Sequence, residues 1–317
     1  MDGGSERDLI DSFGEFASAW DFSSPPAILL LLLLAAYIVG SLRLSVRARS
    51  DLSFWAKLAT GLTGFALLVF ALAGPLDVYA SDLFAAHTSQ HILIAMFAAP
   101  LLLIARPMPA YIWAFPRPLR IGAGTALTEA AIVIRVLRFL TRPVVALLLF
   151  LGSLYGWHIP QFYDASLESE GLHLLMHFTM FAAAVLFWWP IIGPPPVRTQ
   201  LSYPQRIVFL LLAVTPAALL AAFITLSKSV IFEFYLDSPG HFGWSPTEDQ
   251  RIGGLLMWLP GSFVFLTTMT VLFFRWFAEE ESKSFRKAAS RPRRGNASAS
   301  SATASDNQPV HPDDERK

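Results

Sequence analysis

Residues 83–104 read LFAAHTSQHILIAMFAAPLLLI, and this run contains no lysine, arginine, aspartate or glutamate. About 20 apolar residues, each rising ~1.5 Å, are needed to cross the ~30 Å hydrocarbon core of a bilayer, so the run predicts a transmembrane helix. Two histidines, His87 and His91, lie four residues apart near its start. The stretch therefore predicts both a membrane fold and a polar site within it.

Six further apolar runs accompany this one. They are approximately Ala27–Leu42, Trp55–Ala73, Pro143–His158, Gly171–Ile192, Ile207–Leu226 and Gly253–Phe277. Only 15% of the 317 residues are charged, whereas soluble domains carry about 25%. We therefore predict an all-α, polytopic membrane protein with seven transmembrane helices. Pro100, Pro216 and Pro260 lie inside the runs and predict kinks there.

The distribution of basic residues predicts the orientation of the seven spans. If the N-terminus lies outside, all but three of the 24 lysines and arginines fall on the cytoplasmic side. The three exceptions are Arg7, Lys228 and Arg251. Because basic residues concentrate in cytoplasmic loops, we predict an extracytoplasmic N-terminus and a cytoplasmic C-terminus. The outer loops are then rich in acidic residues.

The runs divide the chain into three parts. Residues 1–24 are acidic and lack a basic leader, so we expect an extracytoplasmic segment rather than a signal peptide. Residues 25–280 form the seven-helix domain, with a cytoplasmic amphipathic segment at about 121–141. Residues 281–317 contain few large apolar side chains, which predicts a disordered cytoplasmic tail. Removing residues from about 290 onward should leave folding and function largely intact.

Two histidine pairs share one spacing. His87 and His91 lie in the third run, and His173 and His177 lie in the fifth, in GLHLLMHFTMFAAAVLFWWPIIGP. Residues four apart share a helix face, with β-carbons about 6 Å apart, so each pair can grip one metal ion. Both pairs occur at similar depth near the outer ends of their spans. Two such helices side by side would present four imidazoles at one height.

Other polar residues lie near the same predicted end of the bundle. His158 ends the fourth run, and His241 lies in the loop before the seventh, so either can complete or cap the site. Asp77, Asp82 and Asp164 lie in outer loops. Carboxylates often accept hydrogen bonds from metal-binding imidazoles, and these three are candidates for that role.

The available donors favour particular metals. The chain has no cysteine, which excludes disulfides and thiolate ligands. Met176 and Met180 each lie three residues after a histidine of the second pair. Imidazole combined with thioether suits copper, particularly Cu(I), better than magnesium or calcium. Packing between helices is the alternative role of these methionines.

Three runs together resemble a known family. The runs are HTSQHILIAMFAAPLLLIARP from His87, LYGWHIPQFYDASLES from Leu154 and LHLLMHFTMFAAAVLFWWPIIGP from Leu172. They are similar to the CtaG family of cytochrome c oxidase assembly factors, over about residues 50–280. The resemblance implies a seven-helix protein of the bacterial inner membrane that acts in copper supply during maturation of haem-copper oxidases. The metal ligands that it implies are His87, His91, His173 and His177, with His158 nearby. The sequence GWHIP departs from many members, in which proline follows this histidine directly.

We therefore predict a non-enzymatic assembly factor that binds copper at its outer face and hands it to haem-copper oxidase subunits. Its partners are these subunits and the lipid bilayer, with no nucleic acid. The alternative is a haem-binding electron-transfer protein, because paired histidines can ligate haem iron. A di-metal oxidase would need carboxylates at the depth of the histidines, and the runs contain none there. A retinal receptor would need a lysine in the seventh run, which has none.

Overall fold

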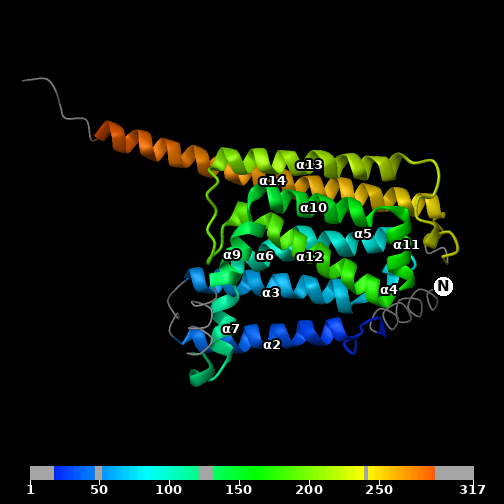
Figure 1. Cartoon of the computed structure of the whole chain (residues 1–317), viewed down its shortest axis with the longest axis horizontal. Coiled ribbons are helices and arrows are strands. Elements are labelled where there is room, and N and C mark those ends of the chain that lie inside the picture. The colour runs from blue at the N-terminus through cyan, green and yellow to red at the C-terminus, as the bar shows by residue number, and fades with distance from the viewer. Residues whose placement is uncertain (1–17, 47–51, 121–130, 239–241, 290–317) are drawn as a thin grey trace, which may run out of the picture. The chain divides into compact units, whose positions relative to one another are not determined.

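The computed structural model describes residues 18–46, 52–120, 131–238 and 242–289. These residues form helices joined by loops, and no strand occurs among them. The chain divides into two compact units, Met1–Phe273 and Phe274–Lys317. In the first unit most of the long helices run side by side (Figure 1).

Six helices are long and apolar enough to cross a membrane. They are α2 (Pro25–Ser45), α3 (Leu52–Ala73), the composite helix Phe84–Ala105, α12 (Glu170–Ile192), α13 (Tyr203–Leu226) and α14 (Pro246–Ala289). The composite helix consists of α5 (Phe84–Ile92), the π-helix η1 (Leu93–Ala98) and α6 (Ala99–Ala105). A seventh candidate is the pair α10 (Pro143–Trp157) and α11 (Pro160–Glu168), which is bent by 74°. The predicted all-α membrane fold is confirmed, with six spans or, counting the bent pair as one, seven.

The bend between α10 and α11 follows from Pro160. Steric clash with a proline ring drives the preceding residue out of the helical region, and Ile159 is indeed extended, with φ −70° and ψ 124°. Pro160 itself suits the first turn of α11, where its missing N–H has no partner to lose. As a result, His158 caps the C-terminus of α10 at the corner.

The π-helix η1 precedes Pro100. Its bonding shift is visible at Ala99, whose N–H donates to the carbonyl of Ile94, five residues earlier. In the same pattern the Ala95 carbonyl would pair with residue 100, but proline has no N–H. The indole N–H of Trp188 on α12 donates to this carbonyl instead, at 3.0 Å. By contrast, α13 and α14 continue as helices through their internal prolines.

Aromatic packing fixes α12 at the centre of the first unit. Phe187 stacks on Phe150 of α10 with ring centroids 4.4 Å apart, and on Phe209 of α13 at 5.2 Å. Trp188 stacks on Phe265 of α14 at 6.2 Å. All five rings are buried. This core holds the helix that carries His173 and His177 against three neighbouring helices.

Short helices occupy the connections. They are α4 (Pro75–Ala80), α7 (Met108–Ala114), α9 (Ala131–Leu140) and the 3-10 turn η2 (Glu233–Tyr235). Within the amphipathic segment predicted at about 121–141, α9 is helical and has no buried residue. Residues 121–130 lie outside the described part of the chain.

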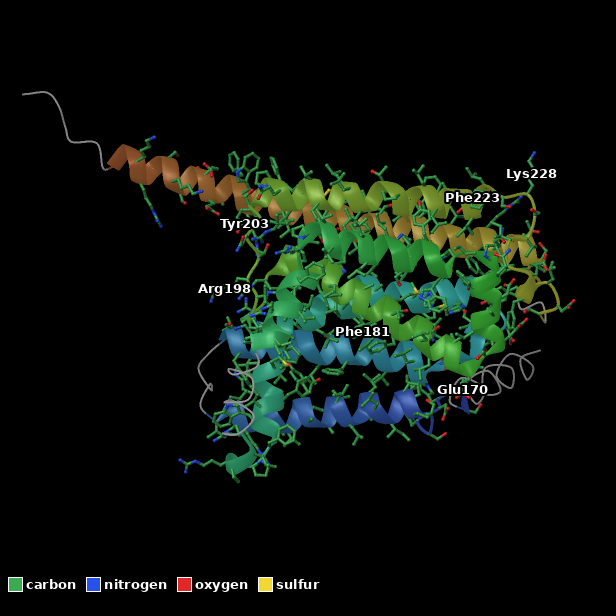
Figure 2. The ribbon with its side chains drawn as sticks, viewed as in Figure 1. Glu170, Phe181, Arg198, Tyr203, Phe223 and Lys228 are labelled. Atoms are coloured by element: carbon green, nitrogen blue, oxygen red, sulfur yellow. The ribbon has the colours of Figure 1, made fainter. Side chains whose placement is uncertain are left out.

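Charged side chains mark the two ends of the first unit. Figure 2 shows Glu170 and Lys228 toward one end and Arg198 toward the other, with Phe181 between them. The orientation of these ends in a membrane remains a prediction. Reporter fusions should place the loops near Tyr79, Asp164 and Asp237 outside, and positions after Phe277 in the cytoplasm. A reporter after Phe277 that is active only outside the cytoplasm would contradict this topology.

The second unit contains the C-terminal part of α14. Lys283 pairs with Glu279 at 2.8 Å and with Glu280 at 3.0 Å. Pairs at these helical spacings support a solvent-exposed helix weakly. The helix extends to Ala289, so residues 281–289, which we expected in the disordered tail, are helical. Their charged side chains suit a helix without forming a core.

Candidate metal centre

The two histidine pairs face each other, one on α5 and the other on α12. Within the pairs, ring centroids lie 4.3 Å apart for His87 and His91, and 4.4 Å apart for His173 and His177. Between the pairs, the rings of His87 and His173 are 5.3 Å apart, and those of His91 and His177 are 5.2 Å apart. The fold therefore brings the two predicted histidine pairs together.

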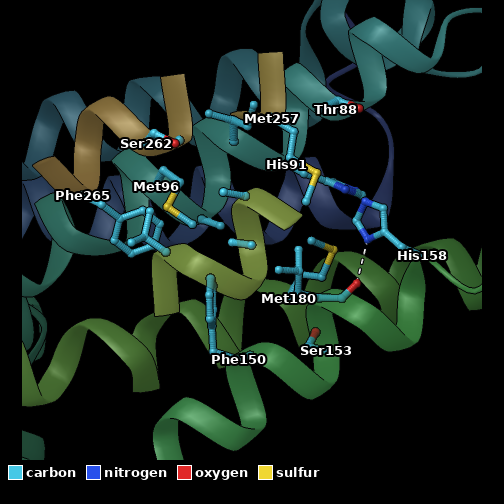
Figure 3. A pocket seen from close by; sticks show the side chains of 18 of the residues that line it. Thr88, His91, Met96, Phe150, Ser153, His158, Met180, Met257, Ser262 and Phe265 are labelled. Atoms are coloured by element: carbon cyan, nitrogen blue, oxygen red, sulfur yellow. Dashed lines mark hydrogen bonds between the residues drawn. The ribbon is translucent and has the colours of Figure 1, made fainter. Parts of the chain in front are cut away.

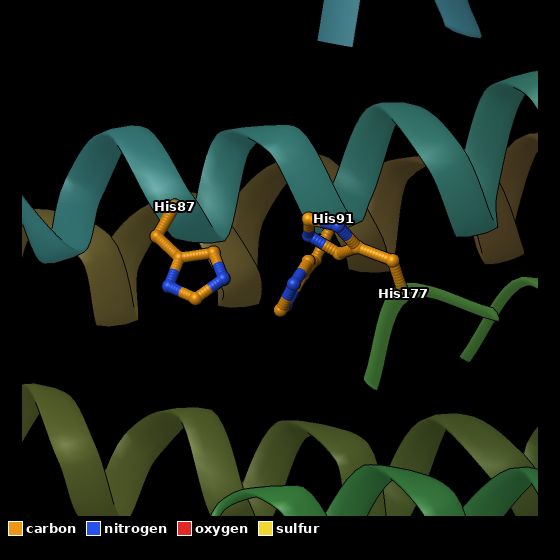
Figure 4. Close-up of side chains that lie close together, drawn as sticks. All are labelled: His87, His91 and His177. Carbon is orange, nitrogen blue, oxygen red and sulfur yellow. The ribbon is translucent and has the colours of Figure 1, made fainter. Parts of the chain in front are cut away.

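The nitrogen atoms of these rings lie close together. Ligand atoms of His87, His91 and His177 all lie within 4.8 Å of one another (Figure 4). The Nε2 atoms of all four histidines, His173 included, are buried without a hydrogen-bond partner. Buried polar atoms are normally paired. The gathered ligand atoms of His87, His91 and His177, with the unpaired Nε2 of His173 on the same facing helices, therefore fit a site for a bound cation.

Hydrogen bonds around His87 fix which nitrogen offers its lone pair. Tyr235 donates its hydroxyl hydrogen to the Ala80 carbonyl at 2.9 Å, so it has no hydrogen left for Nδ1 of His87, 3.1 Å away. Nδ1 can therefore bond to Tyr235 only by carrying the hydrogen and donating it. The hydroxyl of Tyr163, 2.9 Å from the same nitrogen, accepts in that tautomer and donates in the other. Only the tautomer with the hydrogen on Nδ1 makes both contacts hydrogen bonds, and it leaves the lone pair of His87 on Nε2, the buried atom without a partner.

The start of α5 is held by a carboxylate from α14. The oxygens of Asp249 accept the backbone N–H groups of Phe84 at 2.7 Å and Ala85 at 3.0 Å. These N–H groups lie in the first turn of α5 and have no partner within the helix. A negative charge is also favourable at a helix N-terminus. Asp249 is 3% exposed, so this buried cap sets the position of His87, one turn further along.

Asp77 has a different role from the one predicted. It accepts a hydrogen bond from Gln90 Nε2 at 2.6 Å, and the same nitrogen donates to the Ala71 carbonyl at 2.7 Å. Burial raises the pKa of Asp77, and the Gln90 hydrogen bond partly opposes this. Asp164 likewise accepts from the backbone N–H of Phe234, at 3.5 Å. The described bonds of Asp77 and Asp164 therefore brace neighbouring segments, while tyrosines contact His87.

His158 lies outside the group of three histidines. Its Nδ1 donates to the Leu154 carbonyl at 2.7 Å, within the last turn of α10. Its ring lies 6.1 Å from that of Tyr163. Met176 is fully buried and accepts a weak hydrogen bond from Ser166 at 3.4 Å. His241 falls outside the described residues.

Three residues at the centre were not predicted from the sequence. Tyr163 and Tyr235 contact His87, and Asp249 caps its helix. Tyr163 lies in the run that carries the family resemblance, five residues after His158. No spacing pattern connects Tyr235 or Asp249 with the histidines.

The donor set determines the chemistry that the centre can support. The group that gathers here contains histidines only. Imidazole suits copper, zinc, iron and nickel, whereas magnesium and calcium prefer oxygen ligands. Neutral ligands leave the full charge of an ion uncompensated, and a buried charge is costly. The site therefore favours an ion of low charge.

Mycobacterial proteins are among the relatives of this chain. Uncharacterized protein Mb0105 of Mycobacterium bovis is 30% identical over 283 residues, covering 86% of this chain and 41% of its own length. Uncharacterized protein MT0111 of Mycobacterium tuberculosis has the same identity and coverage. Uncharacterized protein ML1998 of Mycobacterium leprae is 27% identical over 285 residues, with the same shares. The chain thus spans about two-fifths of the length of these relatives. No solved structure matches it significantly.

The family comparison agrees with the two histidine pairs and the helical fold. The family model described as "Cytochrome c oxidase caa3 assembly factor" matches residues 35–279. This range contains both histidine pairs, the two tyrosines and Asp249. The chain therefore belongs to the family of cytochrome c oxidase caa3 assembly factors.

Proposed function

We propose that this chain binds copper at the centre formed by His87, His91, His173 and His177 and supports delivery of the ion to a haem-copper oxidase. Copper is the cargo in this proposal, and the protein needs no catalytic residue. Family membership supports a role in oxidase assembly. Two observations carry the proposal: ligand atoms of His87, His91 and His177 converge, and the buried Nε2 atoms of all four histidines have no hydrogen-bond partner among the described residues.

Monovalent copper fits the centre better than a divalent ion. Each positive charge moved from water into a low-dielectric interior is costly unless a counter-charge is present. The ligands are four neutral rings, so a divalent ion would keep two uncompensated charges and Cu(I) only one. Cu(I) also accepts imidazole and thioether ligands readily. We therefore assign Cu(I) as the bound form.

The haem alternative is less compatible with the packing. A haem iron with two axial histidines places the porphyrin plane between the two rings. His87 and His173 could flank such a plane, but His91 and His177 lie 4.3 Å and 4.4 Å from them and occupy the space that the porphyrin would need. A single ion held by His87, His91 and His177, whose ligand atoms lie within 4.8 Å of one another, needs no such space.

Metal analysis of the purified chain tests the proposal directly. The protein, loaded with Cu(I) and desalted, should retain the ion, and His173→Ala/His177→Ala should lose the histidine-bound equivalent. Equal copper retention in the variant, or a Soret band in the parent that disappears in the variant, would contradict the proposal. Thermal unfolding in the same detergent controls for loss of fold.

The tyrosine contact to His87 gives a second expected result. Tyr235→Phe removes the acceptor that holds Nδ1–H and leaves the Ala80 carbonyl without its donor. Tyr163 can then donate to Nδ1, which moves the ring hydrogen to Nε2 and blocks ligation. Loss of a group that orients a metal-binding histidine typically costs ~10–100-fold in affinity. We expect a decrease in this range, measured by competition with a Cu(I) chelator.

Tyr155→Phe is the matched control for this substitution. The hydroxyl of Tyr155 donates to the Pro216 carbonyl at 2.8 Å and is not among the contacts of His87. Its removal should leave the affinity for Cu(I) unchanged. Equal affinities for Tyr235→Phe and Tyr155→Phe would show that the tyrosine does not orient the ligand.

A further inference from the structure

A cavity adjoins the histidine centre and shares His91 with it. Its volume is about 70 Å³, enough for an ion or about two water molecules. Residues from the composite helix, α10, α12, α13 and α14 line it, and all of them belong to the first unit. Most of the lining is aliphatic or aromatic. The few polar and sulfur-containing groups are therefore the features that would recognise a ligand.

Three of the seven methionines line this one cavity. Met96 comes from η1, Met180 from α12 and Met257 from α14. Figure 3 shows Met180 and Met257 at the end of the cavity where His91 and His158 lie, and Met96 near Phe265 toward the other end. Thioethers are soft ligands that select Cu(I) over hard cations. The two ends of the cavity thus differ in the donors that they offer.

His158 presents a free lone pair to this space. Because a carbonyl only accepts hydrogen bonds, Nδ1 must carry the hydrogen that it donates to the Leu154 carbonyl. In the neutral ring the lone pair then lies on Nε2. Ser153, also in the lining, has a buried hydroxyl without a hydrogen-bond partner. Unpaired polar groups of this kind are usually satisfied by a bound species.

We propose that this end of the cavity is a second metal position, in which the Met180 and Met257 sulfurs and Nε2 of His158 bind Cu(I). The cavity lining contains no carboxylate, which disfavours divalent ions for the reason given above. Two thioethers and one imidazole form a neutral, soft donor set. The proposal depends on the proposed copper function only for the identity of the cation. Because His91 also lines the cavity, an ion held here lies beside the four histidines.

The test counts metal equivalents in the purified full-length chain. Ag(I) is a redox-inert probe with the same soft character as Cu(I), and its binding can be followed by calorimetry and by mass spectrometry after desalting. The parent should bind two equivalents. Met180→Leu/Met257→Leu should bind one, and leucine keeps the volume of methionine closely enough for the fold to survive. Met96→Leu, at the other end of the same cavity, is the matched control and should bind two.

The histidine variant separates this proposal from the first one. His173→Ala/His177→Ala changes no residue of the cavity lining and should retain the thioether-bound equivalent. If the parent binds one Ag(I) that disappears in this variant, the second position is wrong and the histidine centre stands. If the single equivalent instead disappears only in Met180→Leu/Met257→Leu, the histidine centre is wrong and the thioether position stands.

X-ray absorption gives an independent result on the parent alone. Cu(I) bound by the histidines has nitrogen neighbours only, whereas Cu(I) in the second position has sulfur neighbours. The spectrum of the fully loaded parent should therefore contain sulfur scattering that Met180→Leu/Met257→Leu lacks. A parent spectrum with nitrogen scattering alone would overturn the proposal, and so would two equivalents in the methionine variant.

Discussion

Cells that carry His87→Ala/His91→Ala should make a cytochrome c oxidase that contains haem but lacks copper and activity. The change removes the two imidazoles that α5 contributes to the centre of four. One of them, His87, is the ring that Tyr163 and Tyr235 orient. The remaining pair cannot surround an ion. Oxidase activity in isolated membranes and copper-to-haem ratios in the purified oxidase measure the effect. Excess copper in the medium should restore part of the activity by mass action.

The control for this experiment is His311→Ala, a histidine from the predicted tail. It removes the same type of side chain and should leave the oxidase loaded with copper. Membrane levels of each variant must equal those of the parent. Normal copper content in the His87→Ala/His91→Ala strain would contradict the proposed function. A loss of haem that copper cannot restore would favour the electron-transfer alternative.

Asp249→Ala should cause the largest loss of stability among single substitutions at the site. It leaves the N–H groups of Phe84 and Ala85 buried without an acceptor, and each such group costs ~1–3 kcal/mol. We expect a decrease of about 2–4 kcal/mol in the free energy of unfolding. With a shift of ~2–4 °C per kcal/mol for chains of this order of size, the melting temperature should fall by roughly 5–15 °C. Thermal unfolding in detergent measures this change.

A neighbouring carboxylate provides the matched comparison. Glu248 is also in the first turn of α14 but is exposed, where it accepts hydrogen bonds from Ser245. Glu248→Ala should lower the melting temperature by much less than Asp249→Ala, because water can replace the lost contact. Asp249→Asn keeps one acceptor oxygen and should lie between the two. Equal shifts for both alanine variants would show that the buried cap does not hold α5.

The sequence predicted the features that depend on local patterns. Apolar runs bounded by charge predict spans, and the four-residue spacing predicts that His87 and His91 share a helix face, as do His173 and His177. These predictions agree with the structure because each depends on the periodicity of one helix. At Pro100 the sequence predicted a kink, and the structure has the π-helix η1 directly before this residue. The π-helix, whose Ala95 carbonyl accepts a hydrogen bond from Trp188 on another helix, was not predicted.

Contacts between distant segments were beyond sequence reasoning. Tyr235 contacts His87 across 148 positions of the chain, and Asp249 reaches Phe84 across 165. No periodic pattern connects such pairs, so the sequence indicated nearby carboxylates as acceptors and not the tyrosines. His158 was predicted close to the pairs. It lies beside them but faces the cavity, because Pro160 ends α10 at that corner.

The π-helical stretch before Pro100 also sets an angular register. Relative to an α-helix it acts as a single inserted residue, and one residue corresponds to about 100° of rotation. The faces of α5 and α6 are therefore turned relative to each other by that amount. Deleting one residue between His91 and Pro100 would turn the whole of α5, both histidines included, away from α12 while leaving the spacing of the pair unchanged. The direction in which the pair points is thus determined by the backbone of η1, which follows it in the chain, and not by the histidine side chains.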